Sequence, residues 1–189
     1  MNNIILTDCD GVLMDWERCF GEWMTSNGYC VNNDYKLSYD MAKRYNITDC
    51  KKEELIKYFN ESSRIGWLPP LRDAIKYVKK LHEEHGYVFH MITSLSKDPY
   101  AGNLRIENTE RLFGKTAFEK YIFLDVGEDK CEELWKYKDS GLLWVEDKAQ
   151  NAEDGIDAGL DSVLIAHPHN KKSLLERYNT WKELYEAII

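Results

Sequence analysis

Short apolar runs alternate with amphipathic segments along most of this chain, and this alternation limits its fold more than any other feature. The apolar runs read as buried strands at 4–7, 87–93, 121–125, 142–146 and 162–166. The segments with helical periodicity lie at 71–86, 103–114, 130–141, 151–160 and 171–189. Strands that alternate with helices predict a parallel sheet covered by helices on both faces. The predicted fold class is therefore α/β, with a Rossmann-like three-layer arrangement.

One region, residues 15–68, interrupts this alternation. It is rich in aromatic residues and contains two helical stretches, roughly 16–27 and 51–63, but no strong buried strand. The pair Pro69-Pro70 forbids helix continuation, and the α/β pattern restarts there. We therefore predict a small helical cap at 15–68, inserted after the first strand. Residues 1–14 and 69–189 form the predicted α/β core.

The composition indicates a soluble chain with one sizeable core. Of the 189 residues, 43% are hydrophobic, and the formal net charge is −8, which disfavours binding to duplex nucleic acid. No apolar stretch approaches the ~20 residues of a membrane span, and the N-terminus lacks the features of a signal peptide. We expect a cytoplasmic protein without a membrane partner. The sequence gives no oligomeric state.

Polar side chains follow four of the predicted strands at the point where each strand ends. In chain order they are Asp8 and Asp10, Thr93 and Ser94, Lys130 at the start of the following helix, and Glu146 with Asp147. In an open parallel sheet, ligands bind at the carboxyl ends of the strands. Any one of these groups alone is more often a cap or a solvated side chain. Their joint placement at one edge predicts a functional site.

The opening stretch "DCDGVL" indicates what kind of site this is. Residues two apart on an extended strand point the same way, so Asp8 and Asp10 can serve one small volume. Crowded carboxylates resist ionisation unless a cation joins them, and hard oxygen ligands suit Mg²⁺. A calcium loop is disfavoured, because its glycine would stand at position six and a glutamate at twelve. Counted from Asp8, Gly11 is fourth and Cys19 is twelfth. We predict a magnesium-dependent phosphoryl-transfer site for a small phosphorylated substrate.

Four motifs of the chain are similar to those of haloacid-dehalogenase-superfamily phosphatases. They are "DCDGVLMDW", "ITS", "DK" and "WVEDKAQN". A narrower resemblance is to the 5′(3′)-deoxyribonucleotidases. It rests on that opening, on "TSLSKDPYAGNLRIENTERLFG", on "EDK" and on the His-Asn pair in "LIAHPHNKK". One departure is Glu146-Asp147, where the nucleotidases usually have two aspartates and where sugar-phosphate mutases have a Glu-Asp pair.

The resemblance implies a catalytic role for four residues. Asp8 attacks phosphorus and forms an aspartyl-phosphate, while Asp10 protonates the leaving oxygen and then activates water. Thr93 hydrogen-bonds a phosphoryl oxygen, and Lys130 neutralises charge on Asp8 and the phosphoryl group. The implied activity is Mg²⁺-dependent hydrolysis of a phosphomonoester, most simply a (deoxy)nucleoside 5′-monophosphate.

The resemblance also implies binding roles. Mg²⁺ is held by Asp8, the backbone carbonyl of Asp10 and Asp147, with Glu146 assisting. Ser94 and Trp16 are expected to bind substrate. For Trp16, stacking on a nucleotide base and packing of the first cap helix remain equal alternatives. Three further residues are expected to stay outside the chemistry: Asn151 orients its loop, and His167 and His169 are solvated loop residues.

Several other functions remain open. With the same fold, the substrate could be a sugar phosphate, for a phosphatase or a mutase, or a polynucleotide 3′-phosphate. A non-enzymatic alternative is a phosphorylatable receiver-like signalling domain. In receivers, however, the phosphorylated aspartate follows the third strand, and no insert follows the first. A binding-only relative is a further alternative, which the complete set of motifs disfavours.

Overall fold

The computed structural model describes residues 3–189, and a six-stranded sheet lies at its centre. The strand order is β3-β2-β1-β4-β5-β6, and each neighbouring pair is parallel. The strands are β1 (Ile4–Thr7), β2 (Val88–Ser94), β3 (Phe118–Leu124), β4 (Leu143–Glu146), β5 (Asp161–Ile165) and β6 (Arg177–Tyr178). From β1 the chain adds β2 and β3 on one side, and it then crosses over to add β4, β5 and β6 on the other side. This order places the carboxyl ends of β1 and β4 side by side.

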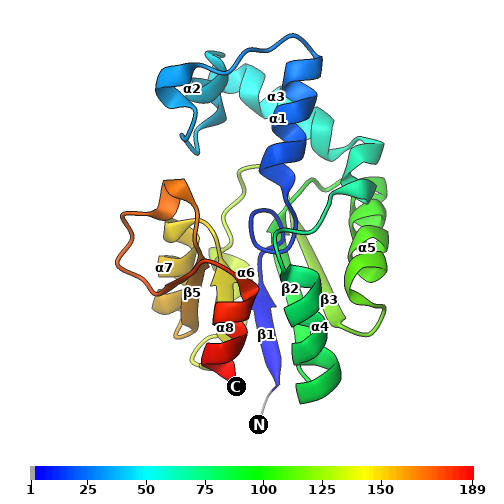
Figure 1. The fold of residues 1–189 in the computed structure, drawn as a ribbon, viewed down its shortest axis with the longest axis vertical. Coiled ribbons are helices and arrows are strands. Elements are labelled where there is room, and N and C mark those ends of the chain that lie inside the picture. Colours follow the sequence, from blue (N-terminus) through cyan, green and yellow to red (C-terminus); the bar gives the residue numbers. More distant parts are fainter. Residues whose placement is uncertain (1–2) are drawn as a thin grey trace.

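Helices cover both faces of the sheet, as Figure 1 shows. Side chains alternate along each strand, so Ile5 and Val145 belong to one buried cluster and Leu6 and Trp144 to the other. The first cluster is covered by α4 (Ala74–His85), α5 (Pro99–Phe113) and α8 (Trp181–Ile188), and the second by α6 (Cys131–Trp135) and α7 (Ala149–Asp157). The predicted three-layer α/β class is therefore confirmed. Within residues 3–189, none of the helices combines the length and the apolar character needed to cross a membrane.

The prediction of one long helix at 171–189 is wrong. Only Trp181–Ile188 is helical, because Thr180 caps a new helix by accepting a hydrogen bond from the backbone N–H of Glu183. Before it, Arg177–Tyr178 pairs with β5 and extends the sheet. Strand β3 also begins three residues earlier than the sequence indicates.

Three helices form a separate layer above the carboxyl ends of the strands (Figure 1). They are α1 (Trp16–Ser26), α2 (Met41–Tyr45) and α3 (Asp49–Asn60), accompanied by the 3-10 turns η1 (Asn33–Tyr35) and η2 (Ser63–Trp67). Their inner side chains are aromatic: Phe20 packs edge-on against Phe59 at a centroid distance of 5.4 Å. The amide of Asn60 links this layer to the core by donating to the carbonyl of Leu95 over 2.8 Å. The domain boundaries at 15 and 68 stay a prediction.

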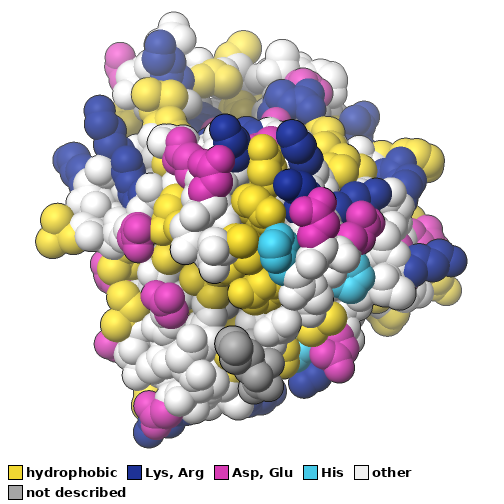
Figure 2. All heavy atoms as spheres, turned by 60° about the horizontal axis from the view of Figure 1, so that its bottom comes forward, with side chains coloured by type: hydrophobic (Ala, Val, Ile, Leu, Met, Phe, Trp, Pro, Cys, Tyr) yellow, Lys and Arg dark blue, Asp and Glu magenta, His cyan; other side chains and the backbone are white. Residues whose placement is uncertain are grey.

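The end of the molecule opposite the cap carries a cavity of about 520 Å³. It lies at the amino ends of the strands, where Ile4 and Leu143 line it together with Ile188. Figure 2 brings this end forward and shows hydrophobic side chains interspersed with charged ones. The polar groups that follow the strands in the sequence are absent from the lining of this cavity, because they lie at the opposite edge of the sheet.

The packing of α7 on the sheet gives a test of the fold. A Cβ at Gly155 would lie 2.5 Å from both Trp144 Cδ1 and Ser162 Oγ, closer than atoms can pack. We predict that Gly155→Ala destabilises the protein by about 1–3 kcal/mol in urea unfolding, because overpacking outweighs the gain in helix propensity. Gly21→Ala is the matched control, since that helical glycine faces only the Tyr45 hydroxyl, at 3.2 Å. Equal effects of the two substitutions would contradict this packing.

Candidate active site

A buried ammonium group joins two of the predicted strand ends. Lys130 caps α6 and is 2% exposed, and its Nζ lies 2.9 Å from Asp8 Oδ1 and 2.9 Å from Glu146 Oε1. Burial disfavours the charged form of this lysine, but the two carboxylates raise its pKa, so it stays protonated. Lys130 therefore fixes the ends of β1 and β4 relative to each other.

The Glu146 carboxylate is fully buried and accepts four hydrogen bonds. The donors are Lys130 Nζ, the side-chain amide of Asn151, and the backbone N–H groups of Asp147 and Lys148. The contact ties Asn151 to Glu146, and the orienting role of Asn151 stays a prediction. Each oxygen of Glu146 accepts two hydrogen bonds, so this carboxylate mainly positions the protein groups around it.

Three carboxylates meet here against a single ammonium. Asp8, Glu146 and Asp147 each present an oxygen, and these atoms all lie within 4.8 Å of one another. Burial, reinforced by the charge of Glu146, raises the pKa of Asp8 to about 6, despite the opposing effect of Lys130. The cluster thus carries uncompensated negative charge. Oxygen donors in this number and setting fit Mg²⁺.

The glycine of the first motif allows Asp147 to approach the loop after β1. Gly11 has φ +78°, and any Cβ at this position would collide with the carboxylate of Asp147. The loop is held from two sides. Trp181 Nε1 donates to the carbonyl of Val12 over 2.8 Å, and His167 Nε2 lies 2.7 Å from the carbonyl of Gly11. This loop therefore presents Asp8 and Asp10 from a fixed backbone.

The two hydroxyl residues after β2 have different surroundings. Thr93 is buried, and its Oγ1 has no hydrogen-bond partner among residues 3–189. A buried hydroxyl without a partner is costly unless a ligand completes it. Ser94 is half-buried and lines a separate small cavity of about 150 Å³ with Lys148 and Asn151.

Asp10 has a partner that the sequence analysis missed. The fully buried guanidinium of Arg105, from α5, binds its carboxylate through two nitrogens, at 2.5 and 3.1 Å. Burial raises the pKa of Asp10, while the positive charge of Arg105 opposes that shift. Asp10 is therefore held by an arginine from α5 in this structure.

The aromatic expected to meet the substrate is used in packing. The ring of Trp16 stacks on Phe20 at a centroid distance of 4.6 Å, and its Nε1 donates to Asn60 Oδ1 over 2.8 Å. A different cap residue, Tyr39, faces the site and packs on His169 with centroids 4.7 Å apart. Its partial burial, and then the charges of Asp147 and Glu146, raise the pKa of Tyr39 well above its ordinary value.

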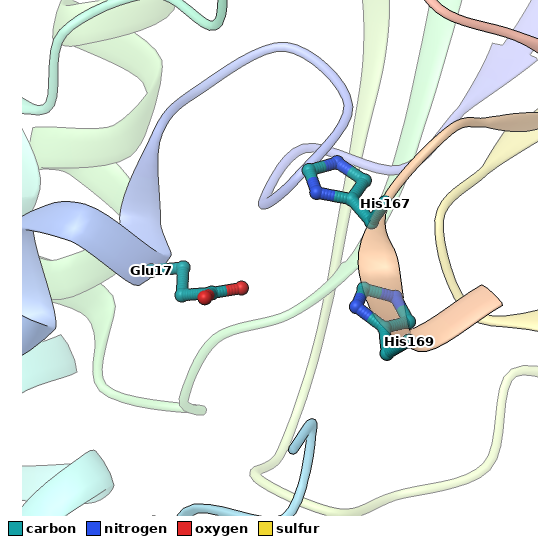
Figure 3. Close-up of side chains that lie close together, drawn as sticks. All are labelled: Glu17, His167 and His169. Carbon is teal, nitrogen blue, oxygen red and sulfur yellow. The ribbon is translucent and has the colours of Figure 1, made fainter. Parts of the chain in front are cut away.

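His167 and His169 are not solvated loop residues, and that prediction is wrong. They lie in and beside the turn η3 (Pro168–Asn170), and both are half-buried. His169 Nε2 lies 2.9 Å from the carbonyl of Asp147, while His167 contacts Gly11. Both imidazoles therefore support the two loops that carry the carboxylates. Figure 3 shows them together with Glu17 of α1.

No protein-family profile matches the chain. An uncharacterised 32.4 kDa protein of Enterobacteria phage T4 is 27% identical over 161 residues. The match covers 81% of this chain and 56% of the phage protein, so the chain spans little more than half the length of that relative.

Solved structures resemble the whole chain. A haloacid dehalogenase-like family hydrolase from Streptococcus pneumoniae superposes with a TM-score of 0.67 at 12% identity, covering 100% of both chains. The chain has the haloacid dehalogenase-like fold. A D,D-heptose 1.7-bisphosphate phosphatase from B. bronchiseptica, solved with magnesium and phosphate, gives a TM-score of 0.60 at 12% identity, covering 98% of this chain and 97% of its own.

The raised pKa of Asp8 makes stability depend on pH. The folded protein takes up a proton at Asp8 near pH 6, while the unfolded chain does so near 3.8. Without divalent metal, folded-state stability should therefore fall as pH rises from about 4 to about 6, by up to about 3 kcal/mol at 1.36 kcal/mol per pKa unit. Asp8→Asn removes this ionisation.

We predict that Asp8→Asn is more stable than wild type at pH 7.5 in EDTA, and that Mg²⁺ stabilises wild type much more than this variant. Urea unfolding between pH 4 and 8, with and without Mg²⁺, measures both effects. A variant that is less stable than wild type at pH 7.5 in EDTA would contradict the assignment of excess negative charge to this cluster.

Proposed function

We propose that this protein is a Mg²⁺-dependent phosphatase that hydrolyses a small phosphomonoester through an aspartyl-phosphate on Asp8. The observation that carries the proposal is the placement of Lys130 Nζ, 2.9 Å from Asp8, at the edge where Asp147 and the Thr93 hydroxyl also lie. With its pKa at about 6, the Asp8 carboxyl group is ionised above neutral pH and can act as a nucleophile. The haloacid dehalogenase-like fold is compatible with this chemistry.

The metal would be held by the carboxylates of Asp8 and Asp147 and by the backbone carbonyl of Asp10. When bound, Mg²⁺ offsets negative charge on the carboxylates and on the phosphoryl oxygens that enter. In this proposal Glu146 supports the cation indirectly, because its oxygens are engaged by Lys130 and three other donors. It sets the position of Lys130 and of the backbone that carries Asp147.

The steps use this chain's own side chains. An Asp8 oxygen forms a bond to phosphorus as the ester P–O bond breaks, and Asp10 gives its proton to the leaving alcohol. In the second half, Asp10 takes a proton from water as that water attacks phosphorus and releases Asp8 and phosphate. Lys130 stays charged throughout, and the Thr93 hydroxyl donates to a phosphoryl oxygen.

In this proposal, the ion pair with Arg105 holds the Asp10 side chain in a fixed position between turnovers. While the guanidinium holds it, the Asp10 carboxylate is ionised and oriented by two hydrogen bonds. Ionised Asp10 is the form needed to accept a proton from water. To act as an acid it must first take up a proton, which burial favours and Arg105 opposes. We assign Arg105 a positioning role.

We propose a (deoxy)nucleoside 5′-monophosphate as the substrate. We also propose that the reaction takes place in the cytoplasm. In the cap, Tyr39 rather than Trp16 is the aromatic side chain that faces the carboxylates, and it is 49% exposed and open to a ligand. Nucleotide bases offer a flat surface for such a ring. Residues 15–68 would then form the cap that closes over the base.

The proposed activity is tested by a phosphate-release screen across nucleoside monophosphates, sugar phosphates and an aryl phosphate, with Mg²⁺ and with EDTA. We expect turnover that requires Mg²⁺, is highest on a nucleoside monophosphate and is lost by several decades in Asp8→Asn. Wild-type turnover in Asp8→Asn would contradict the catalytic assignment. A preference for sugar phosphates would retain the mechanism and replace the substrate class.

The two aromatic residues of the cap should behave differently. Base stacking contributes ~1–3 kcal/mol, so Tyr39→Ala should lower kcat/KM for a nucleoside monophosphate about five- to hundredfold and leave a baseless alkyl phosphate nearly unchanged. Trp16→Ala is the matched control. It should lower Tm and reduce both activities together, since Trp16 packs on Phe20. If Tyr39→Ala lowered kcat/KM equally for both substrates, that result would contradict stacking of Tyr39 on the base.

A further inference from the structure

A second group of ligand-type side chains lies at the junction of cap and core, outside the catalytic carboxylate cluster. Glu17 comes from α1 of the cap, and His167 and His169 come from the loop after β5. Each offers one ligand atom, and these atoms lie within 4.8 Å of one another. We propose that these three residues form a site for a divalent transition-metal cation such as Zn²⁺, separate from the magnesium site and joining the cap to the core.

The hydrogen bonds of the two imidazoles leave one ring nitrogen of each available to a metal. Nε2 of His167 lies 2.7 Å from the carbonyl of Gly11. Nε2 of His169 lies 2.9 Å from the carbonyl of Asp147 and 3.3 Å from Oδ2 of the same residue. A carbonyl oxygen only accepts, so each Nε2 carries the proton and each Nδ1 keeps its lone pair in the neutral ring. Metal-bound histidines donate their second N–H to a carbonyl or carboxylate in this way. The rings are nearly parallel, with an interplanar angle of 13°.

The carboxylate comes from the other side of the junction. Figure 3 shows the Glu17 side chain extending from α1 toward the two rings. Its Oε1 accepts from Arg44 Nη1 over 2.7 Å, which fixes the side chain, and no hydrogen bond engages its Oε2 within the described part of the chain. The Glu17 side chain is 40% exposed, so a cation can reach it. A cavity of about 380 Å³ opens beside the group, and its lining includes Glu17 and His167 as well as four cationic side chains: Arg18, Lys36, Arg44 and Arg72.

The donor set selects the kind of cation. Two imidazoles and one carboxylate suit Zn²⁺ and related transition metals, whereas Mg²⁺ prefers oxygen ligands alone. Around Zn²⁺, with bonds of about 2.0–2.1 Å, neighbouring ligand atoms stand about 3.3–3.5 Å apart. The atoms here all lie within 4.8 Å of one another, so at most a small movement between α1 and the His167 loop would bring them to these distances. The cation would thus fasten the cap over the carboxylate cluster.

Calorimetric titration of Zn²⁺ into the protein, with excess Mg²⁺ present, tests this proposal. We expect one Zn²⁺ per chain in wild type and in Asp8→Asn, because the site does not use Asp8. Glu17→Gln and His167→Gln should each weaken Zn²⁺ binding about tenfold or more. His85→Gln is the matched control: this histidine ends α4 and contacts Tyr185, outside the cap, so its loss should leave Zn²⁺ binding unchanged.

A second measurement keeps the test independent of any variant that folds poorly. In thermal unfolding with Mg²⁺ present, Zn²⁺ should raise the Tm of wild type and of His85→Gln, and raise it much less in Glu17→Gln. Absence of Zn²⁺ binding in wild type would overturn the proposal. So would unchanged binding in both Glu17→Gln and His167→Gln, or loss of binding in Asp8→Asn, which would place the cation on the catalytic carboxylates. None of these readouts depends on phosphatase activity.

Discussion

The buried contact of Lys130 with Asp8 and Glu146 is the interaction on which the rest of the site depends. An ammonium at 2% exposure is tolerable only when carboxylates surround it, and Asp8 and Glu146 supply that negative charge. The contact therefore keeps the ends of β1 and β4 in register with the start of α6. It also leaves the cluster short of positive charge, and the proposed Mg²⁺ would offset that deficit.

The sheet and the edge that carries the site could be predicted because their signals are local. Buried strands are continuous apolar runs, and polar residues at their ends mark where chemistry is possible. The elements that could not be predicted depend on tertiary contacts. Strand β6 has only the two residues Arg177–Tyr178 and exists because β5 offers an open edge. The five-residue helix α2 is too short for any periodic pattern to indicate it.

The same distinction applies to the site residues that sequence reasoning missed. Arg105 did carry a signal, since it stands four residues after Ala101 and three before Asn108, on the face of α5 that the fold buries. A charged residue at such a position needs a charged partner, and Asp10 is that partner. Tyr39 lies in an irregular segment, so no pattern indicates its direction. Its approach to His169 follows only from how the cap sits on the core.

The central claim is that Asp8 carries the phosphoryl group during turnover, and locating that group tests it most directly. Asp10→Asn protein incubated with Mg²⁺ and an aryl phosphate should accumulate the intermediate, because the base for its hydrolysis is lost. After an acid quench and proteolysis, mass spectrometry should find one alkali-labile phosphoryl group, on the Asp8 carboxylate. A phosphoryl group on another residue, or turnover without any covalent phosphoryl-protein, would contradict the account.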